Sequence, residues 1–276
     1  MTDLLDAEQI AEAVLPSLRP RLRKVTVLDE TDSTNSELSR LKSAEQHAHA
    51  ILAERQTGGR GRRQRKWHSP AGGNIYMSFG WQFPRGEYPY STLPLMVAVA
   101  VANALKCIGL AGHGIKWPND ILAGGKKLSG ILVELKTGGS GKATAVIGVG
   151  INVRMPSTES EDPGKIIDRP WTDLESHLAE PFKPCDRNLL ASAVLDQLLA
   201  SLDRFERSGF ETFRSTWKEF DLLENGQTTV ELDEGAVMGV ARGVSEAGEL
   251  ILETTEGETQ LFNAGEVRVY RGIRAF

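Results

Sequence analysis

The 276-residue sequence lacks the marks of secreted, metal-binding and membrane-spanning proteins. Its two cysteines, Cys107 and Cys185, lie far apart, which excludes a disulfide framework and a cysteine zinc site. The acidic start, MTDLLDAEQ, has no basic stretch of the kind that begins a secretory signal. The most apolar run, 93–105, is too short to cross a bilayer and contains Asn103, so we expect a buried helix there. We therefore predict a cytoplasmic protein without membrane contact.

The chain also lacks the excess of positive charge that general nucleic-acid binding needs. Its formal net charge is −5 and its pI is about 5.7. A nucleic-acid surface would therefore have to be a local patch. The 40% hydrophobic and 25% charged content is typical of soluble globular proteins, and the length suits one large domain with a small one.

Hydrophobic periodicity predicts alternating strands and helices up to about residue 225. Ser33 or Thr34 can cap the second helix, because Glu37 follows three residues after Thr34. Glycines predict a hairpin turn at 137–142, and the polar segment 154–168 predicts a mobile loop. In chain order we expect a helix within 1–22, a strand at 25–28, a helix at 33–44, strands at 50–56 and 74–83, a helix at 93–108, strands at 114–118, 127–136 and 143–153, and helices at 187–209 and 210–221.

The pattern changes after residue 225. From there on, short β-like runs alternate with glycine turns every eight to twelve residues, which predicts a small β-barrel of about 50 residues. We therefore expect three parts: a short N-terminal segment, 1–24, a main domain, 25–225, and the small barrel, 226–276.

A basic glycine-rich loop, GGRGRRQRKW, occupies residues 58–67. It carries five cations within seven residues: Arg60, Arg62, Arg63, Arg65 and Lys66. These charges repel one another, so we expect the empty loop to be mobile. Ordering roughly eight residues costs on the order of 10 kcal/mol, which a matching anion can offset. The loop by itself fits a solvated surface, a nucleic-acid contact or a clamp for a small phosphorylated ligand.

Three further segments place polar groups at the ends of elements. KWPND at 116–120 ends a strand in a turn, and GGKKLSGILVE at 124–134 puts Lys126 or Lys127 at the start of a strand. DSTN at 32–35 begins a helix, where free backbone amides can hold a small polar group. Taken singly, each also fits an ordinary turn, a solvated lysine pair or a plain helix cap.

In this order, the four segments resemble the motifs of the biotin protein ligases (biotin–acetyl-CoA-carboxylase ligases), from about residue 25 to the C-terminus. The family's arginine loop is matched by GRGRRQRKW, its lysine-tryptophan-proline-asparagine-aspartate motif by KWPND, and its lysine strand by KLSGILVE. DSTN and the Gly150–Asn152 tripeptide GIN match as well. The chain departs from the family pattern at two places. Gln64 replaces a usual loop glycine. The C-terminal arginine that reaches ATP in the family has no match in register here, which leaves Arg268 and Arg271 as the candidates.

The resemblance implies an α+β fold, with a class II synthetase-like mixed β-sheet flanked by helices and a C-terminal SH3-like β-barrel. It implies that biotin and ATP, with Mg²⁺ brought by the nucleotide, form biotinyl-5′-AMP and pyrophosphate. A lysine of a biotin carboxyl carrier protein of a biotin-dependent carboxylase then accepts the biotinyl group.

The resemblance also assigns roles to individual residues. The implied catalytic residues are Lys127, Arg62 and Asp120. The implied biotin-binding residues are Ser33, Thr34, Asn35, Gln56, Arg60, Gly61, Arg62, Lys127 and Gly130. The implied ATP-binding residues are Arg62, Arg65, Trp67, Lys116, Asn119 and Asn152. No protein metal cage is implied, because Mg²⁺ is expected to arrive with ATP.

Some alternatives stay open. About 24 residues precede the resemblance, too few for the winged-helix domain of the repressor members, so we expect no DNA binding. A lipoate-type ligase on the same fold and a nucleic-acid-binding protein acting through the arginine loop are the rival functions. Because some relatives dimerise along a sheet edge, both a monomer and a homodimer are possible.

Overall fold

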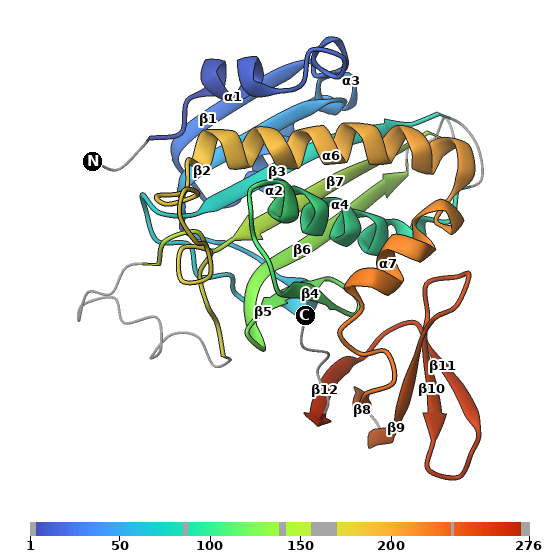
Figure 1. The fold of residues 1–276 in the computed structure, drawn as a ribbon. Coiled ribbons are helices and arrows are strands. Elements are labelled where there is room, and N and C mark those ends of the chain that lie inside the picture. Colours follow the sequence, from blue (N-terminus) through green and yellow to red (C-terminus); the bar gives the residue numbers. More distant parts are fainter. Residues whose placement is uncertain (1–3, 85–87, 138–141, 156–169, 233–234, 272–276) are drawn as a thin grey trace.

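A seven-stranded mixed sheet forms the centre of the larger part of the molecule (Figure 1). The computed structural model describes residues 4–84, 88–137, 142–155, 170–232 and 235–271. The strands are β1 (Lys24–Thr31), β2 (His49–Gln56), β3 (Ile75–Phe83), β4 (His113–Lys116), β5 (Asp120–Ala123), β6 (Lys126–Thr137) and β7 (Ala143–Ile151). Their order is β1-β2-β3-β7-β6-β5-β4, with β1 and β2 parallel and every other neighbouring pair antiparallel.

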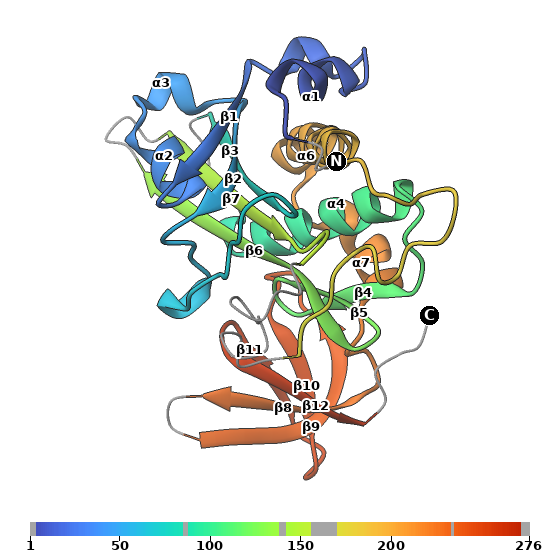
Figure 2. The same cartoon turned by 90° about the vertical axis from the view of Figure 1, so that its left-hand side faces the viewer.

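Helices cover the two faces of this sheet (Figure 2). One face carries α1 (Ala7–Ala13), α4 (Leu93–Cys107), α6 (Arg187–Ser208) and α7 (Arg214–Phe220); the other carries α2 (Thr34–Arg40) and α3 (Ser43–Gln46). Strand β7 shows the division, because Ile147 and Val149 belong to the main core while Val146 packs with Leu38 and Ile51 on the other side. The described residues of this part also contain the 3₁₀ turns Arg19–Arg21, Arg62–Gln64, Tyr90–Thr92 and Glu211–Phe213.

The apolar run at 93–105 is a core helix, as predicted. The segment Tyr90–Cys107 is long and apolar enough to cross a membrane by composition, but 67% of it is buried inside the protein. Helix α4 packs on α6 and β6, so its apolar surface is already covered.

The predicted helix at 33–44 is wrong in one respect, because it is two helices. Helix α2 ends at Arg40, and the side-chain amide of Gln46 donates a 2.7 Å hydrogen bond to the carbonyl of Leu41. That bond satisfies a helix-terminal carbonyl and lets the chain turn before α3. Neither predicted side-chain cap forms: Ser33 is the N-cap residue but makes no capping bond, and Thr34 lies inside the helix.

Strand β5 was not predicted, because the Pro-Asn-Asp sequence was interpreted as a turn only. The turn is there, and it joins β4 to β5 in a hairpin that pairs Lys116 with Asp120. The predicted hairpin between β6 and β7 is confirmed by their antiparallel pairing, although its tip at 138–141 lies outside the described residues. Most of the predicted loop at 154–168 also lies outside them.

The C-terminal region is a separate antiparallel sheet, which confirms the predicted all-β region. It consists of β8 (Gln227–Leu232), β9 (Gly235–Val244), β10 (Leu250–Thr254), β11 (Thr259–Phe262) and β12 (Glu266–Arg271), in the order β11-β10-β9-β8-β12. The indole of Trp117 donates a 3.0 Å hydrogen bond to the carbonyl of Gly248 and so joins the two sheets. The boundaries at 24/25 and 225/226 stay predictions.

Candidate active site

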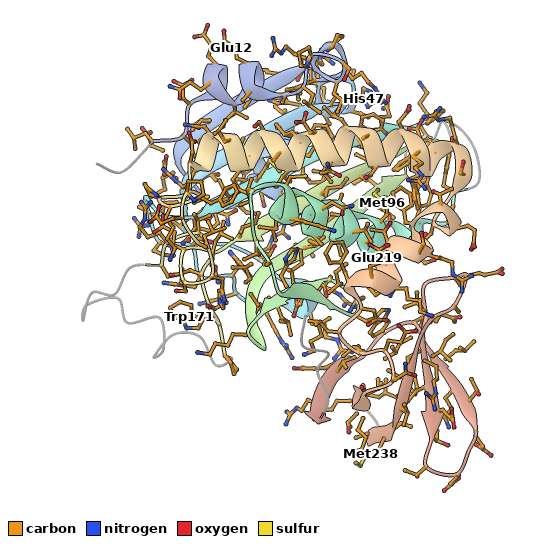
Figure 3. The ribbon with its side chains drawn as sticks, viewed as in Figure 1. Glu12, His47, Met96, Trp171, Glu219 and Met238 are labelled. Atoms are coloured by element: carbon orange, nitrogen blue, oxygen red, sulfur yellow. The ribbon has the colours of Figure 1, made fainter. Side chains whose placement is uncertain are left out.

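One cavity of about 830 Å³ lies between the large sheet, the basic loop and the start of β12. All fifteen residues to which the resemblance assigns a catalytic or binding role line it: Ser33, Thr34, Asn35, Gln56, Arg60, Gly61, Arg62, Arg65, Trp67, Lys116, Asn119, Asp120, Lys127, Gly130 and Asn152. Trp171, labelled in Figure 3, lines it as well. Segments that are far apart in the sequence therefore meet around one hollow.

The register of five strands builds the floor of this cavity. Tyr76 pairs with Gly150, Gly150 with Gly130, Gly130 with Asp120, and Asp120 with Lys116. Directly paired residues point to the same face of a sheet, so these five form one row across β3, β7, β6, β5 and β4. The two glycines leave the middle of the row flat, and the charged pair lies at one end.

A β-bulge decides which of the two adjacent lysines reaches the cavity. Strict alternation from Gly130 would place Lys126 on the cavity face. The pairing instead shifts between Ile121 and Leu122, so that Leu122 lies opposite Lys127. The extra residue reverses the alternation. Lys127 therefore lines the cavity, and Lys126 is exposed.

Lys127 lies at the centre of the charged end. Its Nζ is 2.7 Å from Oδ1 of Asp120 and 5.3 Å from the centre of the Trp67 ring. Burial lowers the pKa of nearby Lys116, while the negative charges of Asp120 and Glu266 act in the opposite direction. An anion that entered here would replace water around partly desolvated cations, a setting in which electrostatic attraction is strong.

The basic loop folds into a small hairpin over the cavity. Arg60 and Lys66 form an antiparallel bridge, and the backbone N–H of Gly61 donates a 2.7 Å hydrogen bond to the carbonyl of Arg65. Arg63 and Gln64 at the tip have φ values of 53° and 58°, in the left-handed region that favours glycine. The departure noted at Gln64 thus falls on a strained position. Ligand-dependent ordering of the loop stays a prediction.

Three of the loop arginines make specific contacts with other segments. Arg60 pairs with Glu134 at 3.2 Å, Arg62 donates a 3.2 Å hydrogen bond to Oδ1 of Asn119, and Arg65 pairs with Glu266. Burial is the main cause that lowers the pKa of Arg62. These contacts favour a clamp on a cavity over a loop that is merely solvated.

Polar side chains line the opposite end of the cavity. Oε1 of Gln56 accepts hydrogen bonds from the backbone N–H of Thr34 at 2.9 Å and from its hydroxyl at 3.2 Å. The hydroxyl of Ser78, 2.5 Å from Oδ1 of Asn35, donates to that oxygen. Ser33, Thr34 and Asn35 are all buried. This end offers neutral donors and acceptors, which suits an uncharged polar ring.

The indole of Trp67 lies directly on the glycine floor. A methyl group added at Gly150 would come within 2.6 Å of the ring, and one at Gly130 within 2.9 Å. The indole N–H is buried and has no hydrogen-bond partner among the described residues. A ligand ring that used the space at Gly130 would therefore have to lie over the indole or displace it.

Two residues predicted to contact ATP, Asn152 and Arg268, bond through their side chains to other parts of the protein. The side-chain amide of Asn152 donates a 3.0 Å hydrogen bond to the carbonyl of Thr172, so it holds a neighbouring segment in place. Arg268 pairs with Glu231 at 2.9 Å and is not among the residues that line the cavity, and the side chain of Arg271 lies outside the described part. The small sheet reaches the cavity through residues 265–267 instead.

Several lining residues were not predicted. The alternation of glycines in the GVGIN stretch could have revealed Gly148 beside Gly150, because two glycines on one face of a strand leave room for a ligand or another backbone. No sequence signal points to Trp171. In the described part of the chain, no three His, Cys, Asp or Glu residues gather in a way that could hold a metal ion.

Comparison with known proteins agrees with this geometry. Residues 27–152 match the Biotin/lipoate A/B protein ligase family, and residues 225–270 match the Biotin protein ligase C terminal domain. The bifunctional ligase/repressor BirA of Salmonella typhimurium is 35% identical over 96% of this chain and 78% of its own length. The biotin–[acetyl-CoA-carboxylase] ligase of Mycobacterium tuberculosis is 32% identical over 89% of this chain and 88% of its own.

A solved structure extends the similarity to three dimensions. The biotin protein ligase of Aquifex aeolicus in complex with biotin and ATP is 30% identical and superposes with a TM-score of 0.72, covering 90% of this chain and 98% of that one.

Proposed function

The chain belongs to the biotin protein ligase family and is a biotin protein ligase, and from this premise we propose how its residues divide the work. In the first half-reaction, the carboxylate of biotin attacks the α-phosphorus of ATP, giving biotinyl-5′-AMP and releasing pyrophosphate. In the second, the ε-amine of a carrier lysine attacks the acyl carbon, and AMP leaves. The carrier is a biotin carboxyl carrier protein of a biotin-dependent carboxylase.

The first half-reaction must bring two anions into contact. The carboxylate and the phosphates repel each other, so cations must be aimed at the charge of the transition state. The observation that carries the proposal is the meeting of Arg62, Lys116 and Lys127, from three separate segments, around one cavity. Lys127 holds the carboxylate and the bridging oxygen, while Lys116, Arg62 and Arg65 hold the phosphates.

The other end of the cavity holds the neutral head group of biotin. Thr34, Asn35 and Gln56 supply hydrogen-bond donors and acceptors in a buried setting. A cyclic urea carries both donors and acceptors, and buried polar groups without partners are costly, so ligands lacking them are rejected. Gly130 and Gly150 leave space for the fused rings.

In the second half-reaction, Asp120 positions or deprotonates the incoming lysine. A free lysine amine has a pKa near 10.4 and is under ~0.1% neutral at pH 7, so an adjacent carboxylate assists. The bond between Asp120 and Lys127 supports this role, because it keeps the carboxylate beside the acyl position. In an Asp120→Asn variant, the rate of biotin transfer to the carrier should fall at least as much as the rate of adenylation. A variant that transfers biotin at the normal rate but adenylates it slowly would contradict the role.

The two carboxylates lining the cavity, Asp120 and Glu266, are already paired with Lys127 and Arg65. Mg²⁺ bound to the nucleotide would therefore take its ligands from phosphate oxygens and water, and it would neutralise phosphate charge. The basic loop closes over the substrates and excludes water from the acyl phosphate. Biotin with ATP should therefore slow proteolysis at 57–66; an unchanged cleavage rate would contradict the clamp.

The remaining expectations are a cytoplasmic location and no DNA contact. A homodimer would use the free edge of the large sheet at β1. Sedimentation of the purified protein distinguishes monomer from dimer.

Biotin-dependent ATP–pyrophosphate exchange tests the function directly. Purified protein should exchange label between pyrophosphate and ATP only when biotin is present, and lipoate should not replace biotin. Exchange driven by lipoate, or none with biotin, would overturn the assignment. Labelling of a carrier domain with biotin then tests the second half-reaction.

A further inference from the structure

Glu134 lies just behind the neutral end of the cavity and is not one of the residues that line it. It is on β6, where it pairs with Val146 of β7, two positions along from the pair Leu132 and Gly148. Gly148 lines the cavity, so Glu134 occupies the next row of the same sheet face.

One oxygen of Glu134 determines how the side-chain amide of Asn35 is oriented. Oε2 accepts a 2.7 Å hydrogen bond from Nδ2 of Asn35. The other end of the same amide, Oδ1, accepts from the hydroxyl of Ser78. A carboxylate can only accept here, so the NH₂ end must face Glu134 and the carbonyl end must face the sheet.

The fixed carbonyl oxygen lies over the floor of the cavity. A methyl group added at Gly148 would come within 2.5 Å of Oδ1 of Asn35. The oxygen has two lone pairs and uses one for Ser78, so the second can accept from a ligand N–H. If the amide were reversed, an NH₂ group would face the ring, and it would oppose the N–H groups of a cyclic urea.

The second partner of Glu134 is Arg60 of the basic loop, at 3.2 Å. This pair is half exposed, at 45% for Arg60 and 32% for Glu134, so solvent screens it and it adds little by itself. The bond to Asn35 is shorter, and Asn35 is only 3% exposed. The main effect of Glu134 on a ligand therefore passes through Asn35.

We propose that Glu134 is a positioning residue that holds the carboxamide of Asn35 with its oxygen toward the N–H groups of the bound cyclic urea. The inference rests on the proposed function. It adds that selection for an N–H-bearing ring depends on a carboxylate that does not touch the ring.

The test is a double-mutant cycle on biotin affinity. Biotin binding is measured by titration calorimetry and biotin KM by pyrophosphate exchange, for Glu134→Ala, Asn35→Ala and the double variant. Losing a charge-assisted hydrogen bond that orients a ligand contact should weaken biotin binding about tenfold in Glu134→Ala. In the Asn35→Ala background, Glu134→Ala should weaken biotin binding by less than about twofold, because the amide that Glu134 positions is gone. The KM for ATP should stay within about twofold.

Two further variants sharpen the result. Glu134→Gln keeps an acceptor for Nδ2 of Asn35, so it should restore most of the biotin affinity lost in Glu134→Ala. Glu30→Ala is the matched control, because Glu30 pairs with Arg55 on the same large sheet and does not line the cavity. It should leave biotin affinity unchanged. If Glu134→Ala does not fold, Glu134→Gln in both backgrounds provides the cycle, with a loss of about threefold that depends on Asn35.

Three outcomes would overturn the inference: an unchanged biotin affinity in Glu134→Ala, an equal loss with and without Asn35, or a parallel rise in the KM for ATP. The control for the underlying premise is the wild-type protein. If the wild type shows no biotin-dependent exchange, the proposed function fails. If it does and the cycle is additive, only the role of Glu134 fails.

Discussion

Replacing Lys127 with alanine should slow biotin-dependent ATP–pyrophosphate exchange by about 10²–10³-fold. Its Nζ lies 2.7 Å from Asp120 and its side chain is 26% exposed, so it is partly desolvated. Two unit charges about 4 Å apart at an effective dielectric constant of about 20 interact by roughly 4 kcal/mol. Loss of one preorganised donor to a developing anion costs about 2.7–4 kcal/mol in other enzymes, and each ~1.4 kcal/mol is tenfold in rate. Because the side chain of Lys127 is partly exposed to solvent, the expected slowing is closer to 10²-fold than to 10³-fold.

Lys126→Ala is the matched control, since Lys126 is the adjacent, exposed lysine and lies on the sheet face opposite to that of Lys127. It should exchange within about twofold of the wild type. Thermal unfolding of both variants shows whether leaving Asp120 without its partner damages the fold. If folded Lys127→Ala exchanges within fivefold of the wild type, the assignment of Lys127 to the reacting anions is refuted.

Three further predictions concern the framework around the site. Burial raises the pKa of Asp221 to about 6 from its ordinary 3.8, so its contribution to stability is present below pH 3.8 and is lost as the pH rises through 6. As the pH rises from 4 to 7, the free energy of unfolding of Asp221→Asn should therefore increase by about 2–3 kcal/mol relative to that of the wild type. Urea unfolding at each pH measures this difference. Arg187→Met leaves Glu54 buried without its 2.8 Å partner and should lower the free energy of unfolding by about 3–5 kcal/mol. Trp117→Phe removes the bond to Gly248 and should cost about 1–3 kcal/mol, with a lower urea midpoint.

Controls and contrary outcomes are available for these three. Arg55→Met breaks the exposed pair with Glu30 and should change the free energy of unfolding by less than ~0.5 kcal/mol. If Arg187→Met lowered it by no more than that, the argument from burial would be contradicted. If the difference in free energy of unfolding between Asp221→Asn and the wild type does not vary from pH 4 to pH 7, Asp221 does not titrate in that range. An unchanged urea midpoint in Trp117→Phe would mean that its indole bond does not hold the two sheets together.

Strongly patterned elements could be predicted from the sequence. The helices at 93–108 and 187–209 and most strands of the large sheet follow directly from their periodicity. Two features could not, because they depend on tertiary contacts. The break between α2 and α3 is stabilised by the side chain of Gln46, and β5 is four residues long and directly follows a strong turn signal.

The site was predicted as a set of residues but not as a geometry. Motif order brought together fifteen lining residues, and the resemblance assigned the catalytic role to Lys127. The strand pattern alone allowed Lys126 or Lys127, because it does not reveal the bulge in β6 that turns Lys127 toward the cavity. The contribution of residues 265–267 arises because a second sheet packs against the first, which no local pattern encodes. Of the two candidate arginines for ATP, Arg268 pairs with Glu231 of the neighbouring strand, and the side chain of Arg271 lies outside the described residues, so the choice between them stays open.

The glycine floor at 130, 148 and 150 limits how this pocket can change by mutation. Any side chain introduced there takes space away, since added carbons would meet Trp67 or Asn35 within 3 Å. New preferences for altered rings must therefore arise at the rim, where exchanging one polar group for another leaves the volume intact. Libraries meant to broaden the range of vitamin analogues should vary the rim and leave these three positions untouched.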